Sequence, residues 1–234
     1  MSSNAALQGL LLAKPGSLGT TRSPAAGTFP IGLGHTRDGL LHVPTSWSAE
    51  EPGPLLVMLH GAGGSAAQVL PAVREAAERH GVLVLVPDSR DTTWDVIRGG
   101  YGPDVAFIDL ALAEAFATFA VDSRRIALGG FSDGASYALS LGLGNGGLFD
   151  HILAFSPGFA APVEAQGNPQ IFLSHGREDA VLPIERCGRR LAGVLGQAGY
   201  DLDYREFAGG HVVPPDLVNA AFARFLGADE GSTR

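Results

Sequence analysis

The sequence has 234 residues, of which 45% are hydrophobic and 17% charged, so it is too apolar for a disordered chain and long enough for one α/β domain. Its formal net charge of −8 argues against nucleic acid or an anionic membrane as a partner and leaves a small neutral substrate open. The single cysteine, Cys187, cannot form an internal disulfide and is expected to be a buried or half-buried thiol on a helix.

The two ends of the chain carry little structural signal. Residues 1–27 are rich in Gly, Ser, Thr, Ala and Pro without a sustained period, which indicates a loosely attached arm. We expect one domain over residues 28–228 and a short tail over 229–234. No basic segment precedes the first apolar run, and no run is long enough to span a membrane. The expectation is a cytoplasmic protein, monomeric or homodimeric.

The ordered part begins with a predicted antiparallel strand pair over residues 28–33 and 39–44, joined by a turn at Asp38-Gly39. The apolar run over 54–61 is too short for a helix and is typical of a strand buried on both faces. Helices and strands then alternate. The predicted helices cover residues 66–81, 103–119, the stretch after 132, 184–199 and 214–226, and the predicted strands cover 82–87, 124–131, 151–157, 170–176 and 201–207.

This alternation predicts an α/β fold with a mostly parallel central sheet and helices on both of its faces, because strands separated by helices need crossover connections. In such sheets ligands bind beyond the carboxyl ends of the strands. Candidate functional residues are therefore sought where strands end.

A serine stands between two glycines in GGFSDG, residues 129–134, where an apolar strand ends and a small-residue helical pattern begins. The G-x-S-x-G motif at such a strand-to-helix turn is typical of a nucleophile, and the helix N-terminus favours a developing oxyanion. Ser132 is therefore the candidate nucleophile. The alternative, a serine that only caps the following helix, does not by itself explain both glycines.

A serine hydroxyl needs a base, usually an imidazole oriented by a carboxylate. Among the seven histidines, His211 follows two glycines in a loop between the last predicted strand and the last helix, where the chain can fold back over the sheet. His60 and His175 also end strands, but each precedes a glycine and suits a hydrogen-bonded imidazole that supports a loop. Less suitable positions are occupied by His35, His42, His80 and His151.

The orienting carboxylate is expected between the serine and the histidine in the chain, just past a strand. Asp179 in SHGREDAVLP meets both conditions. Glu178 is the nearest rival, whereas Asp201 and Asp203 begin a strand instead of following one. The alternative for Asp179 is an aspartate that caps the next helix.

The stretch LHGAGGS, residues 59–65, leaves a central strand with three glycines and exposes backbone N–H groups. The N–H groups of Ala62 and Asp133 are the predicted pair of donors for a tetrahedral oxyanion, and losing one such donor typically costs about 2.7–4 kcal/mol. Gly61 and Gly63 are further candidates for this task.

The same loop allows a dinucleotide-binding alternative. Gly61, Gly63 and Ala66 fit G-x-G-x-x-G/A between a strand and a helix, and Asp88 ends the next strand. This hypothesis gives no role to the serine, aspartate and histidine at three further strand ends.

With GFSDG, HGAGG, HGREDAVLP and GGHVVP, the chain resembles the α/β-hydrolase fold, in particular small bacterial carboxylesterases of the phospholipase/carboxylesterase group, relatives of acyl-protein thioesterases. The resemblance covers most of the chain. It implies a triad of Ser132, Asp179 and His211, with Ala62 and Asp133 as oxyanion donors. Thioesterase relatives commonly carry Gln after the nucleophile, where this chain has Asp133, so the resemblance does not extend to thioesterase activity on lipidated protein.

The connection over residues 156–170 is too short for a cap domain, so the site should be open and shallow. A second long connection, residues 89–104, lies near the strand ends. The candidate substrate-binding residues are Trp94, Ile97, Tyr101, Phe159, Val181, Leu182 and Val212. Core packing is an equally good interpretation of Trp94.

The predicted function is that of a serine carboxylesterase that hydrolyses short-chain acyl or aryl esters through an acyl-enzyme on Ser132. The mechanism needs a small-molecule ester and neither a metal nor an organic cofactor. The alternatives are lysophospholipase or acyl-thioesterase activity on longer acyl chains, and a module of the same fold that binds a ligand without turnover.

Overall fold

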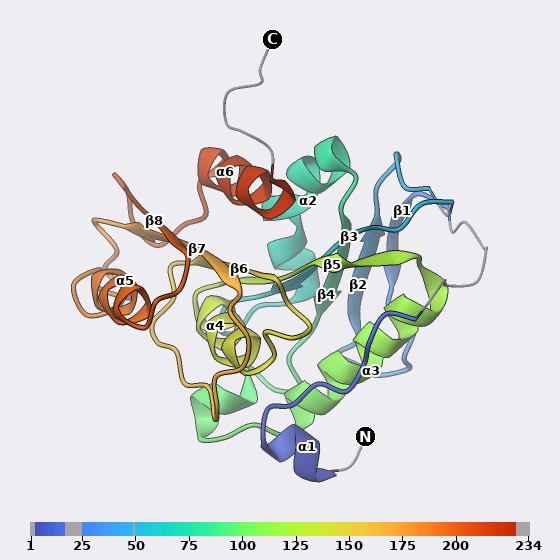
Figure 1. The fold of residues 1–234 in the computed structure, drawn as a ribbon, viewed down its shortest axis with the longest axis horizontal. Helices are drawn as coiled ribbons and strands as arrows, with labels where there is room; N and C mark the ends of the chain where they lie inside the picture. The colour runs from blue at the N-terminus through green and yellow to red at the C-terminus, as the bar shows by residue number, and fades with distance from the viewer. Residues whose placement is uncertain (1–2, 17–24, 49, 228–234) are drawn as a thin grey trace.

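The computed structural model describes residues 3–16, 25–48 and 50–227 (Figure 1). Its strands are β1 (Gly27–Pro30), β2 (Gly39–Val43), β3 (Gly53–Leu59), β4 (Leu83–Pro87), β5 (Val121–Phe131), β6 (His151–Phe155), β7 (Gln170–Gly176) and β8 (Leu202–Phe207). Its α-helices are α1 (Ser3–Leu7), α2 (Ala66–His80), α3 (Pro103–Thr118), α4 (Asp133–Gly144), α5 (Gly188–Gln197) and α6 (Pro215–Leu226), and η1 (Asp95–Arg98) is a short 3₁₀ helix.

The strands form one eight-stranded sheet in the order β1-β2-β4-β3-β5-β6-β7-β8. β1 pairs antiparallel with β2, as the sequence predicts, and β2 runs antiparallel to β4. All other neighbours are parallel. The segments that follow β3, β5, β7 and β8 therefore leave the sheet at the same edge, where sites in open α/β sheets are found.

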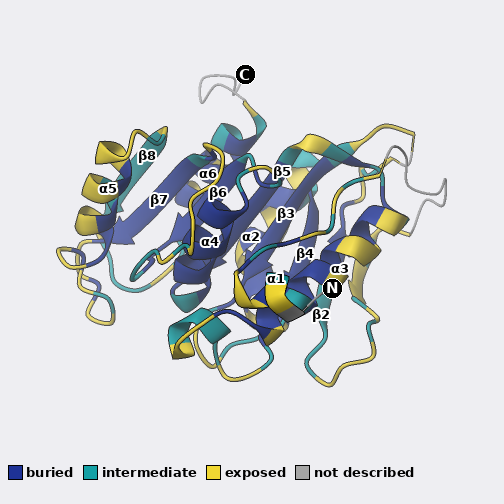
Figure 2. Cartoon of the chain, turned by 60° about the horizontal axis from the view of Figure 1, so that its bottom comes forward, coloured by how far each residue is buried: buried dark blue, intermediate teal, exposed yellow. Residues whose placement is uncertain are grey.

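Helices cover both faces of the sheet (Figure 1). α2 and α6 pack on one face, α3, α4 and α5 pack on the other, and α1 packs against α3. The side chains of β3 from Leu55 to Leu59 are all fully buried, because neighbours cover them on both sides. Figure 2 shows the buried central strands between helices whose outer surfaces, on α3 and α5, are exposed. This arrangement confirms the predicted α/β class.

The N-terminal segment over residues 3–16 differs from the predicted loose arm. The side chains of Ala6 and Leu11 are buried. The backbone N–H of Leu11 donates to Asn145 at 2.9 Å, and the N–H groups of Leu12 and Ala13 donate to the buried Asp109 carboxylate at 2.6 and 2.8 Å. These hydrogen bonds hold the segment against α3 and α4. The predicted C-terminal tail lies outside the described residues.

The connection between β6 and β7 contains no helix or strand, so the structure shows no cap domain there. The last crossover differs slightly from the prediction, because α5 begins at Gly188 after a turn in which the N–H groups of Arg186 and Cys187 donate to the Pro183 carbonyl. Cys187 is a buried thiol, as expected, but it directly precedes α5 instead of lying on a helix. Within the described ranges, no helix combines the length and apolar character that crossing a bilayer requires.

Candidate active site

Ser132 occupies a strained turn between β5 and α4. Its φ of 58° and ψ of −120° are rare for a residue with a side chain. The flanking glycines make this turn possible: a Cβ on Gly130 would lie 2.2 Å from the Gly134 carbonyl oxygen, and one on Gly134 would lie 2.3 Å from the Leu59 carbonyl oxygen. Both glycines are therefore needed for close backbone approach, which a helix cap alone would not require.

The structure brings the three predicted triad residues together. His211 Nε2 lies 2.8 Å from Ser132 Oγ, and His211 Nδ1 lies 2.6 Å from Asp179 Oδ2. The Asp179 side chain is fully buried, whereas 15% of the His211 side chain is exposed. A ring whose Nδ1–H donates to the carboxylate has its Nε2 lone pair free to accept the serine proton. The arrangement can therefore deprotonate Ser132 during attack on a carbonyl carbon.

Asp179 is fixed by backbone and side-chain donors. Its Oδ1 accepts the N–H groups of Val181 and Leu182 at 2.9 and 2.8 Å. Burial raises the pKa of Asp179, but the hydrogen bond from Leu182 and the contact with His211 outweigh it, so the net pKa lies below its usual value. The carboxylate therefore stays ionised at neutral pH and can stabilise an imidazolium on His211.

The other two histidines at strand ends are structural, as the sequence suggests. His175 is fully buried and donates from Nε2 to the Leu182 carbonyl at 2.7 Å, which holds the turn that carries Asp179. His60 accepts the Ser89 N–H on Nε2 at 3.0 Å and donates from Nδ1 to the Gly61 carbonyl at 2.7 Å. Burial lowers the pKa of His60, which favours this neutral form.

The two predicted oxyanion donors have free N–H groups in the part of the chain that the structure describes: neither Ala62 nor Asp133 donates a backbone hydrogen bond there. Asp133 is the first residue of α4, where backbone N–H groups have no partner within the helix. Gly63 is not available for this task, because its N–H donates to the Thr92 carbonyl at 2.6 Å. A Cβ on Gly61 would lie 3.3 Å from the Ser132 Cβ, which places this loop directly beside the serine.

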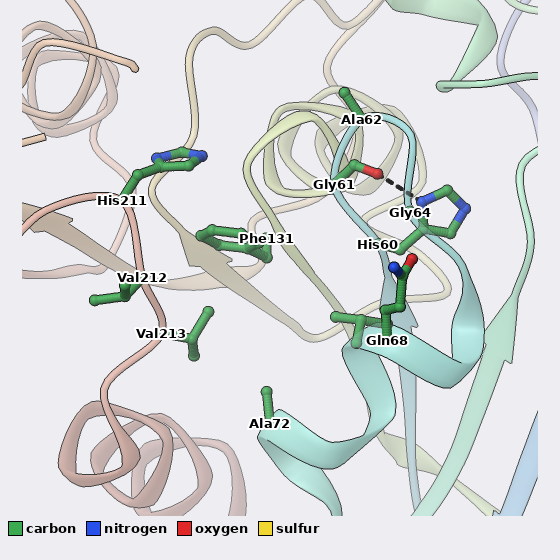
Figure 3. Close-up of a pocket in the computed structure, with 11 residues that line it drawn as sticks. His60, Gly61, Ala62, Gly64, Gln68, Ala72, Phe131, His211, Val212 and Val213 are labelled. Carbon is green, nitrogen blue, oxygen red and sulfur yellow. Dashed lines mark hydrogen bonds between the residues drawn. The ribbon is translucent and has the colours of Figure 1, made fainter. Parts of the chain in front are cut away.

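A cavity of about 410 Å³ opens beside His211. Figure 3 shows the segment from His211 to Val213 on one side, the loop at Ala62 with α2 on the other, and Phe131 between them. Its lining consists of His60, Gly61, Ala62, Gly64, Gln68, Val69, Ala72, Phe131, His211, Val212 and Val213. The cavity is mostly apolar and touches both the base and an oxyanion donor, which suits one side of an ester.

Most of the predicted substrate-binding residues lie away from this cavity; only Val212 of that group lines it. Trp94 is fully buried and donates from Nε1 to the His60 carbonyl at 2.8 Å, so it packs the core. Tyr101 is also buried, with its hydroxyl 3.2 Å from the Ala161 carbonyl. Ile97 packs against the buried core, Val181 is 66% exposed, Phe159 lines a separate cavity of about 290 Å³, and Leu182 packs near Gly158.

The predicted site residues do not include the lining residues Gln68, Val69, Ala72, Phe131 and Val213. Gln68, Val69 and Ala72 lie on the first turns of α2, directly after the oxyanion loop. Phe131 and Val213 stand one and two residues from the catalytic candidates. Proximity in the chain to Ser132, His211 and the glycine loop was the available signal.

The dinucleotide alternative is wrong in its key acidic residue. The Asp88 carboxylate accepts the N–H of Ala66 at 2.6 Å, which caps the start of α2. A carboxylate used in this way stabilises the helix N-terminus and is not presented to a ribose.

A pair of acids, of which Asp104 is buried and Asp95 half-buried, supports the 89–104 connection. Asp95 and Asp104 exchange backbone N–H to carboxylate hydrogen bonds at 2.7 and 2.9 Å. Burial, aided by the neighbouring Asp95 charge, raises the pKa of Asp104 to about 6 in spite of the hydrogen bond from the Arg90 N–H. Burial likewise raises the pKa of Asp95.

This pair predicts a pH-dependent stability. Because the pKa of Asp104 is raised in the folded state, the folded state holds the proton more tightly than the unfolded state, and its stabilising contribution is lost as pH rises from about 4 to about 6. We expect the free energy of unfolding of the wild type, relative to Asp104→Asn, to fall by about 2 kcal/mol between pH 4 and pH 7. Urea denaturation of both proteins across this range measures the difference in unfolding free energy. A difference that stays constant with pH would contradict the raised pKa of Asp104.

The profile of the phospholipase/carboxylesterase family matches residues 105–225, more than half of the chain and the part that contains Ser132, Asp179 and His211. The chain belongs to the phospholipase/carboxylesterase family. The match begins after the glycine loop, so the family model does not cover Ala62, and its position in the site comes from the structure.

Curated relatives of this family member include esterases and a thioesterase. It is 26% identical to a probable feruloyl esterase C of Aspergillus oryzae, over 64% of this chain and 57% of the relative. It is 36% identical to acyl-protein thioesterase 1 of Gibberella zeae, over 41% of this chain and 45% of the relative. The chain thus spans less than two thirds of the length of these relatives.

Solved structures of esterases share the fold. Esterase PE8 superposes with a TM-score of 0.63 at 21% identity, covering 88% of this chain and 99% of that one. FphF, a fluorophosphonate-binding serine hydrolase of Staphylococcus aureus, gives a TM-score of 0.67 at 12% identity, with 87% and 99% covered. The predicted α/β-hydrolase fold is confirmed.

Proposed function

We propose that this family member is a serine carboxylesterase that hydrolyses short-chain acyl or aryl esters. The observation that carries the proposal is the hydrogen-bonded series from Ser132 Oγ through His211 to Asp179, placed beside two backbone N–H groups that have no acceptor among the described residues. The names of the feruloyl esterase and thioesterase relatives support hydrolysis of an acyl ester or thioester by the same group of proteins.

The proposed reaction is a two-step acyl transfer. Ser132 Oγ attacks the ester carbonyl carbon while His211 Nε2 takes the hydroxyl proton, and the carbonyl oxygen becomes an oxyanion facing the N–H groups of Ala62 and Asp133. As the carbon–oxygen bond breaks, His211 gives its proton to the departing alcohol. Water then attacks the acyl-enzyme with His211 again as the base, releasing the acid and restoring Ser132.

Asp179 supports both steps without giving up its charge. Its carboxylate keeps the Nδ1–H tautomer of His211 in place and stabilises the imidazolium formed in each attack. The lowered pKa of Asp179 fits this role, since a protonated acid could not accept the Nδ1–H.

The cavity beside His211 favours short acyl groups. Val69 forms its buried floor, but Ala62, Gln68, Ala72 and Val212 are exposed at its rim, so the cavity is open. Methylenes that extend past the apolar wall must lie across the polar Gln68 or in water, where they gain little of the roughly 0.8 kcal/mol that burial of one methylene provides.

Kinetics with p-nitrophenyl esters from acetate to dodecanoate measure this preference. We expect kcat/KM to be highest for acetate or butyrate and at least about tenfold lower for the dodecanoate. A maximum at twelve carbons or more would contradict the open short-chain site and favour the alternative of lysophospholipase or thioesterase activity. If the folded protein hydrolysed none of these esters, the result would favour the alternative of a module that binds a ligand without turnover.

A further inference from the structure

Residues 92–94, which we name the brace segment, bind the loop that carries one oxyanion donor. The Thr92 carbonyl accepts the N–H of Gly63 at 2.6 Å. Trp94 Nε1–H donates to the His60 carbonyl at 2.8 Å. These two contacts fall on either side of Ala62 in the chain, so the brace segment fixes the loop before and after the residue whose N–H is free.

The residue between those two contacts binds the other oxyanion donor. Thr93 Oγ1–H donates to Asp133 Oδ2 at 2.7 Å. Asp133 is the first residue of α4 and supplies the second free N–H. The three residues of the brace segment therefore contact both segments that supply the predicted oxyanion N–H groups, the loop at Ala62 and the start of α4.

The brace segment is itself anchored on the helix that carries the nucleophile. The Trp94 ring stacks on Tyr137 of α4 with ring centroids 5.1 Å apart. The Tyr137 hydroxyl donates to Asp95 at 2.9 Å, and Asp95 is tied to Asp104 by the reciprocal hydrogen bonds described above. Because Trp94 and Tyr137 are fully buried, these contacts leave the segment little freedom.

The Asp133 side chain also poses an electrostatic problem. A carboxylate attached to an oxyanion donor repels the negative charge that develops in the transition state, and the repulsion grows as the carboxylate approaches that charge. The hydrogen bond to Thr93 holds the carboxylate on the side of the brace segment. The same hydrogen bond therefore orients the backbone N–H of Asp133 and fixes the position of its carboxylate charge.

We propose that Thr93 is a positioning residue of the proposed esterase, acting through the Asp133 carboxylate to align the oxyanion hole. The inference rests on the proposed function and assigns to the 89–104 connection a role in transition-state stabilisation. Thr93 does not line the cavity beside His211, and its hydroxyl acts on Asp133, so we expect its effect in kcat and not in KM.

Thr93→Val removes the hydroxyl with little change in shape, and Thr93→Ser keeps it. We expect Thr93→Val to lower kcat for p-nitrophenyl butyrate about tenfold with KM within twofold of the wild type, because displacing a preorganised donor costs less than deleting it. Thr93→Ser should retain kcat within threefold. Thermal unfolding of both variants within a few degrees of the wild type controls for stability.

A double-mutant cycle separates the pair from its surroundings. If Thr93 acts through the Asp133 carboxylate, Thr93→Val should change kcat less than twofold in an Asp133→Ala background. A tenfold loss in that background would show that the valine acts by another route and would overturn the proposal.

A ligand that binds without turnover tests the role of the brace segment separately from the proposed esterase activity. Phenyl trifluoromethyl ketone captures Ser132 as a hemiketal: the serine oxygen adds to the carbonyl carbon, the proton passes to His211, and the carbonyl oxygen becomes the oxyanion. Its affinity, measured by calorimetry, should fall about tenfold in Thr93→Val and stay near wild type in Thr93→Ser. If Thr93→Val and Thr93→Ser bound the ketone equally well, the positioning role of Thr93 would be overturned. A tenfold loss of affinity in Thr93→Val, in a protein that hydrolyses no ester, would support that role and overturn the proposed function.

Discussion

Replacing Ser132 with alanine is expected to lower kcat for p-nitrophenyl acetate by about 10⁶-fold, because it removes the atom that forms the acyl-enzyme. The Ser132 Oγ has one hydrogen-bonding partner among the described residues, His211 Nε2, so its loss should leave stability nearly unchanged. Stopped-flow or steady-state release of p-nitrophenol measures the rate, and thermal unfolding checks the fold.

Ser123→Ala is the matched control for this variant. Ser123 is exposed on β5, at the opposite end of the strand that leads into Ser132. We expect wild-type activity from the control. If Ser132→Ala retained more than about a hundredth of the wild-type rate, the proposal of covalent catalysis by this serine would be wrong.

Replacing Asp179 with asparagine is expected to lower kcat by about 10⁴-fold with a much smaller change in KM. The amide oxygen can still accept the N–H groups of Val181 and Leu182, but the amide nitrogen then faces His211 Nδ1 as a donor. The ring proton is then driven to Nε2, where it points at Ser132 Oγ. A protonated Nε2 has no free lone pair with which to accept the serine proton.

Glu178→Gln is the matched control, because Glu178 was the nearest rival for the acid. Its side chain is exposed and has no hydrogen bond to any described residue, while its backbone N–H donates to the Gly209 carbonyl at 2.9 Å. Kinetics of the two variants at pH 7 decide between the acids. We expect Glu178→Gln within twofold of the wild type, and the reverse ranking would contradict the assignment of Asp179.

The catalytic candidates could be predicted from sequence because they follow parallel strands. β5, β7 and the end of β8 deliver Ser132, Asp179 and His211 to one edge of the sheet, and their spacing from glycines marked the turns. The close approach at Gly130 and Gly134 is likewise a local property of the turn.

Contacts between residues distant in sequence could not be predicted in the same way. Composition indicated a loose arm at the N-terminus, but the segment is held by Asp109 and Asn145, about 100 residues away or more. From the sequence, Trp94 suited a cavity wall and core packing equally well. Its hydrogen bond to His60 and its stacking on Tyr137 arise only in the folded chain.

The substrate cavity depends on the relative placement of α2 and the His211 loop. Gln68 and Val213 are separated by most of the chain and meet at the same cavity. A helical pattern shows which face of α2 is apolar, but not which loop lies opposite its first turn. The lining residues therefore needed the structure, whereas the triad did not.

The most direct test of the account is chemical labelling of Ser132. Incubating the wild type and Ser132→Ala with a fluorophosphonate probe, followed by mass spectrometry of the intact chain and of its peptides, locates the reactive nucleophile. The account predicts one probe per chain on the peptide containing Ser132 in the wild type and none in the variant. Labelling of a different residue, or ester hydrolysis by a wild type whose Ser132 stays unlabelled, would contradict it.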